Sequence, residues 1–368
     1  MKNRSLSYDF IRTISTIGIL IAHYQYYVSV CVIGDGALLF PWYFASCDFT
    51  SISVSCFFVL SGASLMYSVL QQEEKTFNLK SYYLKRVKSI YPSFYCVWLI
   101  SYIFYRFNGN PVCTEPWKII YTILGIDGWA GQFSGTNYYL TGEWFLGTMI
   151  FLYLLFPFYL KLQQKSIPLL LCLVTVLFFI GMQCGNIGLN FYESALVRSV
   201  EFVFGMLFTR FVSLPPGHMP PPCTHIQVCI AALAVCVLGV FMHWVVDIHV
   251  MGQIILSGIA AFIVLYYMGI YAMKIPLVAK YAKAFSAISF PFYLLHHTIL
   301  ALTSSPFFGN EACSTPRKYY ILFTAFCTTV FAACVVKMFV SWIVRQGTAV
   351  LTGNGKIWKR DRNGEGVH

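Results

Sequence analysis

Long apolar segments dominate this chain of 368 residues and limit what it can fold into. A helix that crosses a lipid bilayer needs about 20 mostly apolar residues, because each residue adds only about 1.5 Å of length. Ten segments come close to that length and predict an all-α, polytopic membrane protein with about ten transmembrane helices. They are residues 10–32, 51–70, 91–105, 141–160, 167–185, 197–213, 226–246, 252–273, 284–304 and 319–344.

Composition excludes the soluble alternatives. Hydrophobic residues make up 58% of the chain and charged residues only 11%, whereas about a quarter of a soluble domain is charged. A soluble two-domain enzyme, a disordered chain and a coiled coil do not have this composition. Arg12 and His23 lie in the first segment and no small-x-small cleavage site follows it, so we expect a retained membrane span there instead of a signal peptide.

The positions of Lys and Arg predict the orientation in the membrane. With the N-terminus inside and ten alternating spans, 18 of the 25 fall on the cytoplasmic side, 5 on the outer side and two within spans. Cytoplasmic loops carry the excess of Lys and Arg in membrane proteins, so both termini are expected in the cytoplasm. We expect a membrane domain over 1–345 and a basic cytoplasmic tail over 346–368. Much of the net charge of +11 then reflects topology, and no exposed basic domain indicates nucleic-acid binding.

The 13 cysteines show no C-x-x-C pair and no Cys/His spacing typical of a metal site, so no metal is expected. Most lie in apolar segments, where a thiol behaves as a small hydrophobic group. Cys113 and Cys313 lie in two loops, where they form either a disulfide or two free thiols.

The first apolar segment contains ionisable residues, which are costly inside a bilayer unless they are paired or line a polar cavity. Asp9 and Arg12 are three residues apart on a helix and can form an ion pair. Arg12 and His23 are eleven residues apart, so they project from one helix face about 16 Å apart along its axis. The structural alternative is that Arg12 extends to the headgroups while His23 hydrogen-bonds a neighbouring helix.

Four further patterns carry small, cationic or aromatic residues. Ser61 and Gly62 can allow close helix packing. A cluster of cations, Lys85, Arg86 and Lys88, is either a phosphate-binding site or a cytoplasmic anchor. The third pattern is Trp144, Leu146, Tyr153 and Pro157, in which Trp144 is alternatively an interfacial residue, and the fourth is Ser289, Tyr293, Leu294, His296 and His297.

Together these patterns resemble the acyltransferase 3 family of integral membrane enzymes, which O-acylate glycans and related acceptors. The order and approximate intervals match over residues 9 to 296. The matching motifs are Arg12 with His23, the segment Phe57 to Gly62, the basic patch Arg86 to Pro92, the Trp144 pattern and the Ser289 to His296 pattern.

Two positions depart from the family pattern. Ser89 stands where many members carry a second Arg, and Met149 stands where many carry a Glu. Lys85 and Lys88 can supply the missing charge, although as point donors without the guanidinium fork. The chain resembles the members that have no soluble esterase-like domain.

The resemblance implies an O-acyltransferase that takes an acyl group, most often acetyl, from cytoplasmic acyl-CoA. Lys85, Arg86 and Lys88 would bind the donor phosphates, and His23, with Arg12, would be catalytic, as a general base or a transient acyl carrier. The acceptor would be a glycan or a lipid-linked glycan precursor, and the location a bacterial inner membrane. Asp9, Ser61, Trp144, Tyr153, Tyr293 and His296 are expected to bind substrate or to support the site.

Two other classes of protein share some of these features. A secondary transporter or flippase of a lipid or glycan intermediate also has many spans and intramembrane ionisable residues. Against it, the two halves show no matching helices broken by Gly or Pro. A noncatalytic partner in glycan synthesis would not need an intact His23 together with a cationic patch.

Overall fold

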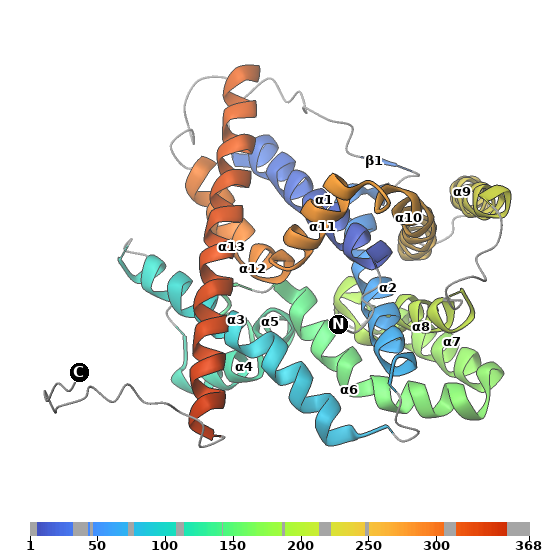
Figure 1. Ribbon diagram of the computed structural model, residues 1–368, viewed down its shortest axis with the longest axis horizontal. Helices are drawn as coiled ribbons and strands as arrows, with labels where there is room; N and C mark the ends of the chain where they lie inside the picture. Colours follow the sequence, from blue (N-terminus) through green and yellow to red (C-terminus); the bar gives the residue numbers. More distant parts are fainter. Residues whose placement is uncertain are drawn as a thin grey trace, which may run out of the picture.

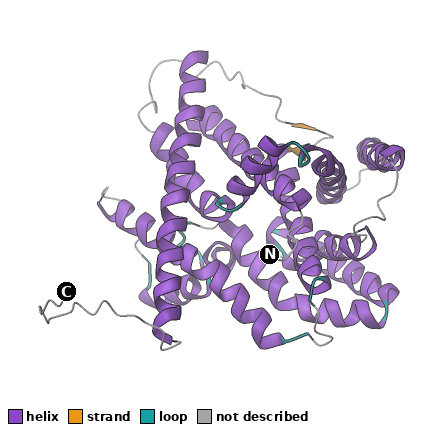
Figure 2. Ribbon diagram, viewed as in Figure 1, coloured by secondary structure: helices purple, strands orange, loops and turns teal. Residues whose placement is uncertain are grey.

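The computed structural model describes residues 6–31, 43–44, 47–72, 77–107, 114–141, 143–185, 188–212, 222–246, 250–304 and 314–351. Within these residues the chain is almost entirely helical (Figure 2). The strands β1 (Tyr43–Phe44) and β2 (Cys47–Asp48) form one short antiparallel pair. The all-α prediction is therefore confirmed.

The helices follow one another in the order shown in Figure 1. They are α1 (Leu6–Cys31), α2 (Phe49–Leu70), α3 (Leu79–Phe107), the 3-10 helix η1 (Pro116–Lys118), α4 (Ile119–Leu124), α5 (Asp127–Ser134), α6 (Glu143–Lys165), α7 (Ile167–Cys184), the 3-10 helix η3 (Phe191–Glu193), α8 (Ala195–Val212), α9 (Pro222–Val246), α10 (Val250–Ala272), α11 (Pro276–Ser286), α12 (Ser289–Ser304) and α13 (Thr315–Leu351).

Each of the ten predicted apolar segments falls on a helix, but helix length and apolarity support fewer spans. Among the described residues, α2, α6, α7, α10 and α13 are long and apolar enough to cross a membrane, and the bent pair α11 and α12 is a sixth candidate. Other helices carry more charge, such as α8 with Arg198, Glu201 and Arg210. The structure supports a multi-pass membrane protein, while the number ten and the cytoplasmic termini are not confirmed.

Helix α3 differs from the prediction in its length. The expected span was 91–105, preceded by a basic segment, whereas the helix runs without a break from Leu79 to Phe107. Lys85 and Arg86 therefore belong to the same rigid helix as the apolar residues that follow them. Both side chains therefore project from a helix and not from a loop.

The expected span 284–304 is two helices instead of one. Helices α11 and α12 meet at an angle of 68°. Pro291 gives the physical reason: its ring would collide with the carbonyl group of residue 287 in a continuous helix, and it has no N–H to donate. At the bend, the Ser289 hydroxyl donates to the backbone oxygen of Ser286 at 2.9 Å.

Helices α2 and α8 pack with their backbones in direct contact. A Cβ atom at Gly62 would lie 1.9 Å from the backbone oxygen of Phe202, and one at Gly205 would lie 1.9 Å from that of Val59. The prediction that Gly62 permits close helix packing is confirmed. Helix α2 also packs against α1 and α10, so it lies at the centre of the fold (Figure 1).

Candidate functional site

One face of α1 carries the two residues that the sequence singled out. Arg12, Thr16, Ile19 and His23 follow one another at helical intervals of four, three and four residues. Arg12 lines a cavity between helices, and Thr16 and Ile19 line a small space next to it that His296 also lines. The His23 ring lies 5.1 Å from the His296 ring, measured between centroids. The prediction that Arg12 and His23 share a face is therefore confirmed.

Arg12 is held at one end of this face by polar groups from three helices. Its Nη1 lies 3.6 Å from Oδ1 of Asp9, which confirms the predicted ion pair. The same nitrogen donates to the Ser286 hydroxyl at 3.2 Å, and Nη2 donates to the Ser64 hydroxyl at 3.4 Å. Ser286 in turn donates to Asp9 at 2.7 Å. Asp9 is buried while Arg12 keeps 28% of its side chain exposed, so the guanidinium is both fixed and accessible.

A cavity of 230 Å³, which we call the motif cavity, brings together the patterns that were separate in sequence. Helices α1, α2, α3, α6 and α12 all contribute to its wall. Phe57 and Tyr293 also line the small space next to His296, so the motif cavity continues toward the imidazoles. The residues that line the motif cavity are Arg12, Phe57, Leu60, Ser61, Ser89, Ile90, Phe145, Leu146, Met149, Tyr153, Ser289, Phe290 and Tyr293.

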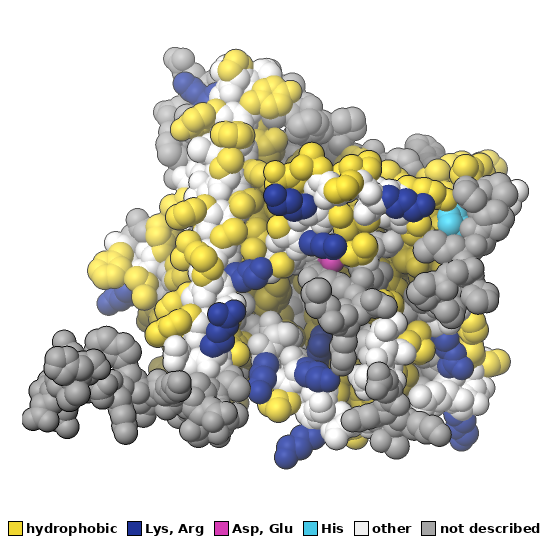
Figure 3. Space-filling view, in the orientation of Figure 1, with side chains coloured by type: hydrophobic (Ala, Val, Ile, Leu, Met, Phe, Trp, Pro, Cys, Tyr) yellow, Lys and Arg dark blue, Asp and Glu magenta, His cyan; other side chains and the backbone are white. Residues whose placement is uncertain are grey.

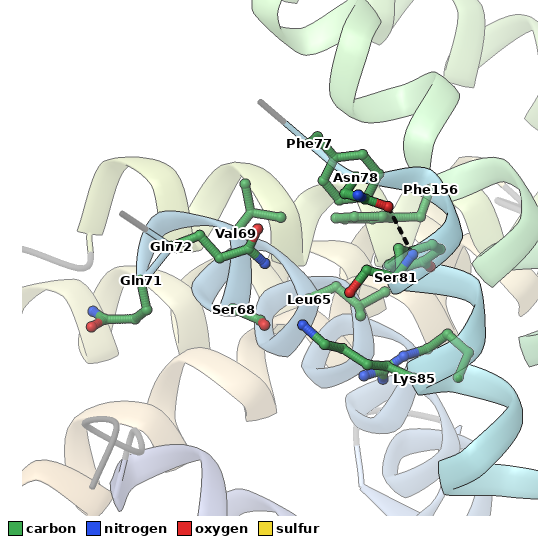
Figure 4. Close-up of a pocket in the computed structure, with 12 residues that line it drawn as sticks. Leu65, Ser68, Val69, Gln71, Gln72, Phe77, Asn78, Ser81, Lys85 and Phe156 are labelled. Carbon is green, nitrogen blue, oxygen red and sulfur yellow. Dashed lines mark hydrogen bonds between the residues drawn. The ribbon is translucent and has the colours of Figure 1, made fainter. Parts of the chain in front are cut away.

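A second, larger cavity of 590 Å³ lies between α2, α3 and α6, and we call it the cationic cavity. Figure 4 shows Lys85 with its amine directed toward Leu65 and Ser68 on α2. Asn78 accepts a hydrogen bond from the Ser81 backbone N–H at 2.9 Å, which fixes the start of α3 at the cavity edge. The cavity is lined by Leu65, Ser68, Val69, Gln71, Gln72, Phe77, Asn78, Ser81, Tyr82, Lys85, Arg86 and Phe156.

Arg86 connects the two cavities. It lines the cationic cavity, and its guanidinium carbon lies 5.8 Å from the ring centroid of Tyr153, which lines the motif cavity. It also lies 6.0 Å from the Tyr82 ring, so two aromatic faces hold the cation in place. Lys88 is exposed and lines neither cavity.

Three imidazoles meet at the other end of the α1 face, and we call them the histidine cluster: His23, His296 and His297. Their ring centroids lie 4.1 Å apart for His23 and His297 and 4.4 Å apart for His296 and His297. One ligand nitrogen from each ring lies within 4.8 Å of the others. His296, which ends the matching family motif, and His297, which follows it in the same sequence pattern, therefore lie together with His23.

The contacts of His296 indicate its tautomer. Its Nδ1 lies 2.5 Å from the backbone oxygen of Tyr293. A carbonyl oxygen can only accept, so Nδ1 carries the hydrogen and the neutral ring has its lone pair on Nε2. That Nε2 is buried and has no hydrogen-bond partner among the described residues.

Sequence reasoning missed a second charged pair, Arg198 and Glu201 on α8. Their side chains are almost wholly buried, and Nη1 of Arg198 lies 2.9 Å from Oε1 of Glu201. The guanidinium carbon lies 5.0 Å from the Phe58 ring and 5.6 Å from the Trp144 ring, and Nε donates to the Tyr192 backbone oxygen at 2.9 Å. Trp144 therefore packs on this pair and does not line the motif cavity. An Arg and a Glu three residues apart in an apolar helix are the signal that could have revealed the pair.

Some predicted features lie outside the described residues. Cys113 and Cys313 belong to them, so the choice between a disulfide and free thiols stays open. Ser286, by contrast, is described and contacts both Asp9 and Arg12, but nothing in its sequence surroundings distinguished it from other serines.

Fold and site together define a multi-pass membrane protein in which cavities lead from cationic side chains to a cluster of imidazoles. Comparison with known families gives this class a name. A family model described as an acyltransferase domain, Acyl_transf_3, matches residues 5–345, which is nearly the whole chain. The chain belongs to this family, as the sequence motifs predicted, and is a membrane acyltransferase.

One curated relative is similar over part of the chain. An uncharacterized protein of Haemophilus influenzae is 27% identical over 176 residues, which cover 44% of this chain and 71% of that protein. No solved structure matches the chain.

Proposed function

We propose that the protein transfers an acyl group, most simply acetyl, from cytoplasmic acyl-CoA to a hydroxyl group of a glycan or lipid-linked glycan precursor in a bacterial inner membrane. One observation carries the proposal. Motif residues from five helices line the motif cavity, which Arg12 borders and the Arg86–Tyr153 contact joins to the cationic cavity, and Phe57 and Tyr293 connect it to the small space lined by His296, beside His23. A donor with phosphates at one end and a thioester at the other matches that arrangement of charge.

The cationic cavity fits the phosphate-bearing end of the donor. Lys85 and Arg86 line it, and both side chains form charge-assisted hydrogen bonds with phosphate oxygens in many proteins. Gln71, Gln72 and Asn78 add neutral donors and acceptors suited to a nucleotide. Arg12, partly exposed in the motif cavity, would contact the donor further along.

The motif cavity fits the arm that carries the thioester. Its wall is mostly aromatic and aliphatic, with Ser61, Ser89 and Ser289 as isolated polar groups. Such a wall can hold an uncharged arm and exclude water from the reacting thioester. Phe57 and Tyr293 lie where the arm would pass toward His23.

His23 would act as general base. It would accept the proton of the acceptor hydroxyl while that oxygen attacks the thioester carbonyl carbon. The new C–O bond forms, the C–S bond breaks, and the sulfur of CoA leaves with the proton that His23 received. In the alternative, the acyl group passes first to a His23 nitrogen and then to the acceptor.

The proposed topology places the donor on the cytoplasmic side, with ten spans and both termini in the cytoplasm. The distribution of Lys and Arg along the sequence supports it, because 18 of the 25 fall in segments expected on the inner side. Figure 3 shows one face of the molecule, over which Lys and Arg side chains are spread with a small acidic patch among them.

The test is transfer of label from acetyl-CoA to a glycan in membranes that contain the protein. We expect wild-type protein to label the glycan, and His23→Ala to lose about 10²–10⁴-fold of the rate, the usual contribution of a general base. His225→Ala is the matched control, because His225 is a buried histidine on α9 that contacts Tyr271 instead of the histidine cluster. Undiminished transfer by well-folded His23→Ala protein, or transport of an unmodified glycan without labelling, contradicts the proposal.

A further inference from the structure

The histidine cluster holds more imidazoles than a general base requires. One base accounts for His23, but His296 and His297 come from α12, far along the chain, and lie against it with ring centroids 4.1 to 5.1 Å apart. The ligand nitrogens of all three rings lie within 4.8 Å of one another.

His296 is oriented in the way that metal-binding histidines are. A metal ligand typically donates its other ring N–H to a backbone carbonyl or carboxylate, which fixes the tautomer and aims the lone pair at the ion. His296 makes this contact through Nδ1 and the Tyr293 oxygen, at 2.5 Å. Its Nε2 is buried, with no hydrogen-bond partner among the residues that the structure describes. A buried lone pair without a partner is costly, and a cation would satisfy it.

We propose that His23, His296 and His297 form a binding site for a divalent transition-metal ion of the Zn²⁺ type, and that the bound ion inhibits acyl transfer. Three neutral imidazoles are a known ligand set for Zn²⁺, with the fourth position left to a water molecule. Ca²⁺ and Mg²⁺ prefer oxygen ligands and do not fit a cluster of nitrogens.

The geometry needs only small adjustments. Imidazole nitrogens lie about 2.0–2.1 Å from Zn²⁺, so in a tetrahedral site they are about 3.4 Å from one another. The present limit of 4.8 Å means that side-chain rotations must bring the most distant pair about 1.4 Å closer. His23 and His297 are only half-buried, so both rings have room to turn.

The inhibitory effect rests on the proposed function. A general base needs the lone pair of a His23 nitrogen, and a metal ion would take it. Binding of the ion and proton transfer from the acceptor hydroxyl are then mutually exclusive. Spacing along the chain could not predict that the three histidines meet, because they come from helices more than 270 residues apart.

The test is metal binding by the purified full-length protein in detergent, after chelators have removed bound ions. We expect about one Co²⁺ per chain, with the visible absorption of a nitrogen-coordinated ion, and displacement by Zn²⁺. His297→Ala should weaken binding by more than about 10–100-fold, because losing only an outer-shell partner already costs that much. His225→Ala should bind as wild-type protein does.

Two measurements distinguish loss of metal binding from loss of folding. Gel filtration and thermal unfolding show whether His297→Ala is folded, and His297→Gln serves as a second variant. Absence of Co²⁺ binding by wild-type protein, or equal binding by folded His297 variants, overturns the site. Zn²⁺ should lower wild-type acyl transfer and leave the His297 variants less affected, and stimulation by Zn²⁺ would overturn the inhibitory role. Metal binding does not depend on catalysis, so loss of the proposed function would appear only in the transfer assay.

Discussion

Arg12 and Arg198 each pair with a carboxylate on their own helix, but they differ in how exposed their side chains are. Arg12 on α1 and Arg198 on α8 each lie three residues from a carboxylate on the same helix. Arg198 and Glu201 are 1% and 0% exposed, and two aromatic rings lie close to the guanidinium. Arg12 keeps 28% exposure and faces a cavity, although its partner Asp9 is buried.

The difference shows that an ion pair inside a membrane domain is not by itself evidence of a ligand site. The described hydrogen bonds of Arg198 all go to protein oxygens, those of Glu201 and Tyr192. This pair therefore stabilises the packing of α8. Arg12 is positioned by Asp9 and Ser286 and still borders a cavity. Access to a cavity, and not charge pairing, separates the binding role proposed for Arg12 from the structural role of Arg198.

The largest effect is expected from Arg198→Met. This change leaves the Glu201 carboxylate buried without its cation, which typically costs about 3–5 kcal/mol of unfolding free energy. We expect little folded protein by gel filtration in detergent and a much lower unfolding temperature. The double variant Arg198→Met/Glu201→Gln should recover much of the loss, because removing both charges is often nearly neutral. If the single variant is as stable as wild-type protein, the structural role of the pair is wrong.

Arg12→Lys should instead affect donor binding. The substitution keeps a positive charge next to Asp9 and loses the guanidinium fork. Losing one charge-assisted hydrogen bond of about 1.5–3 kcal/mol should raise KM for acyl-CoA about 10–100-fold. The unfolding temperature should stay close to that of wild-type protein. A loss of stability as large as that of Arg198→Met would remove the contrast between the two arginines.

A third buried carboxylate, Asp127 on α5, tests what burial does without a cation. Thr122 donates to its Oδ1 at 3.0 Å, and Oδ2 has no hydrogen-bond partner in the described part of the chain. Burial raises the pKa of Asp127 from 3.8 to about 6, so the folded state holds this proton more tightly than the unfolded chain does.

The unfolding free energy should therefore fall as the pH rises from about 4 to about 6 and stay low above that range. Asp127→Asn should remove this dependence and stabilise α4 and α5 by about 2 kcal/mol at pH 7. Hydrogen exchange in these two helices, compared between variant and wild-type protein at each pH, is the measurement. Equal protection of both proteins at pH 7 would contradict the prediction.

The smallest expected effect is a difference in KM between substitutions of two lysines on α3. Lys85 lines the cationic cavity and Lys88 does not. Lys85 is exposed, so Lys85→Ala should cost only about 0.5–1 kcal/mol of donor binding and raise KM for acyl-CoA a few-fold. Lys88→Ala is the matched control and should leave KM unchanged. Equal effects of the two changes would indicate a general attraction by surface charge instead of a site.

The sequence predicted the helices better than the topology. Apolar length located a helix at every expected segment, because that pattern is local. The bend between α11 and α12 was missed, since apolarity continues through it and only Pro291 indicates a break. The number of membrane spans could not be predicted from composition either, because helices such as α8 mix charged and apolar residues.

Relative placement within one helix could be predicted from spacing. Arg12 and His23 could be placed on one face of α1 from their separation. Of the predicted cluster Lys85, Arg86 and Lys88, only the first two line the cationic cavity. Contacts between distant helices could not be predicted in the same way. Ser286 beside Arg12, His297 beside His23, and Trp144 on Arg198 depend on packing that no local pattern encodes.

The backbone contacts at Gly62 and Gly205 determine which walls of the motif cavity can move. No layer of side chains separates α2 from α8 there, so neither helix can slide or roll without collision of backbone atoms. Phe57, Leu60 and Ser61 on α2 therefore form a fixed wall. Any widening must come from the other helices that line the cavity, α1, α3, α6 and α12. In the proposed reaction, the largest acyl group that the protein accepts is set by how far these helices can move away from α2.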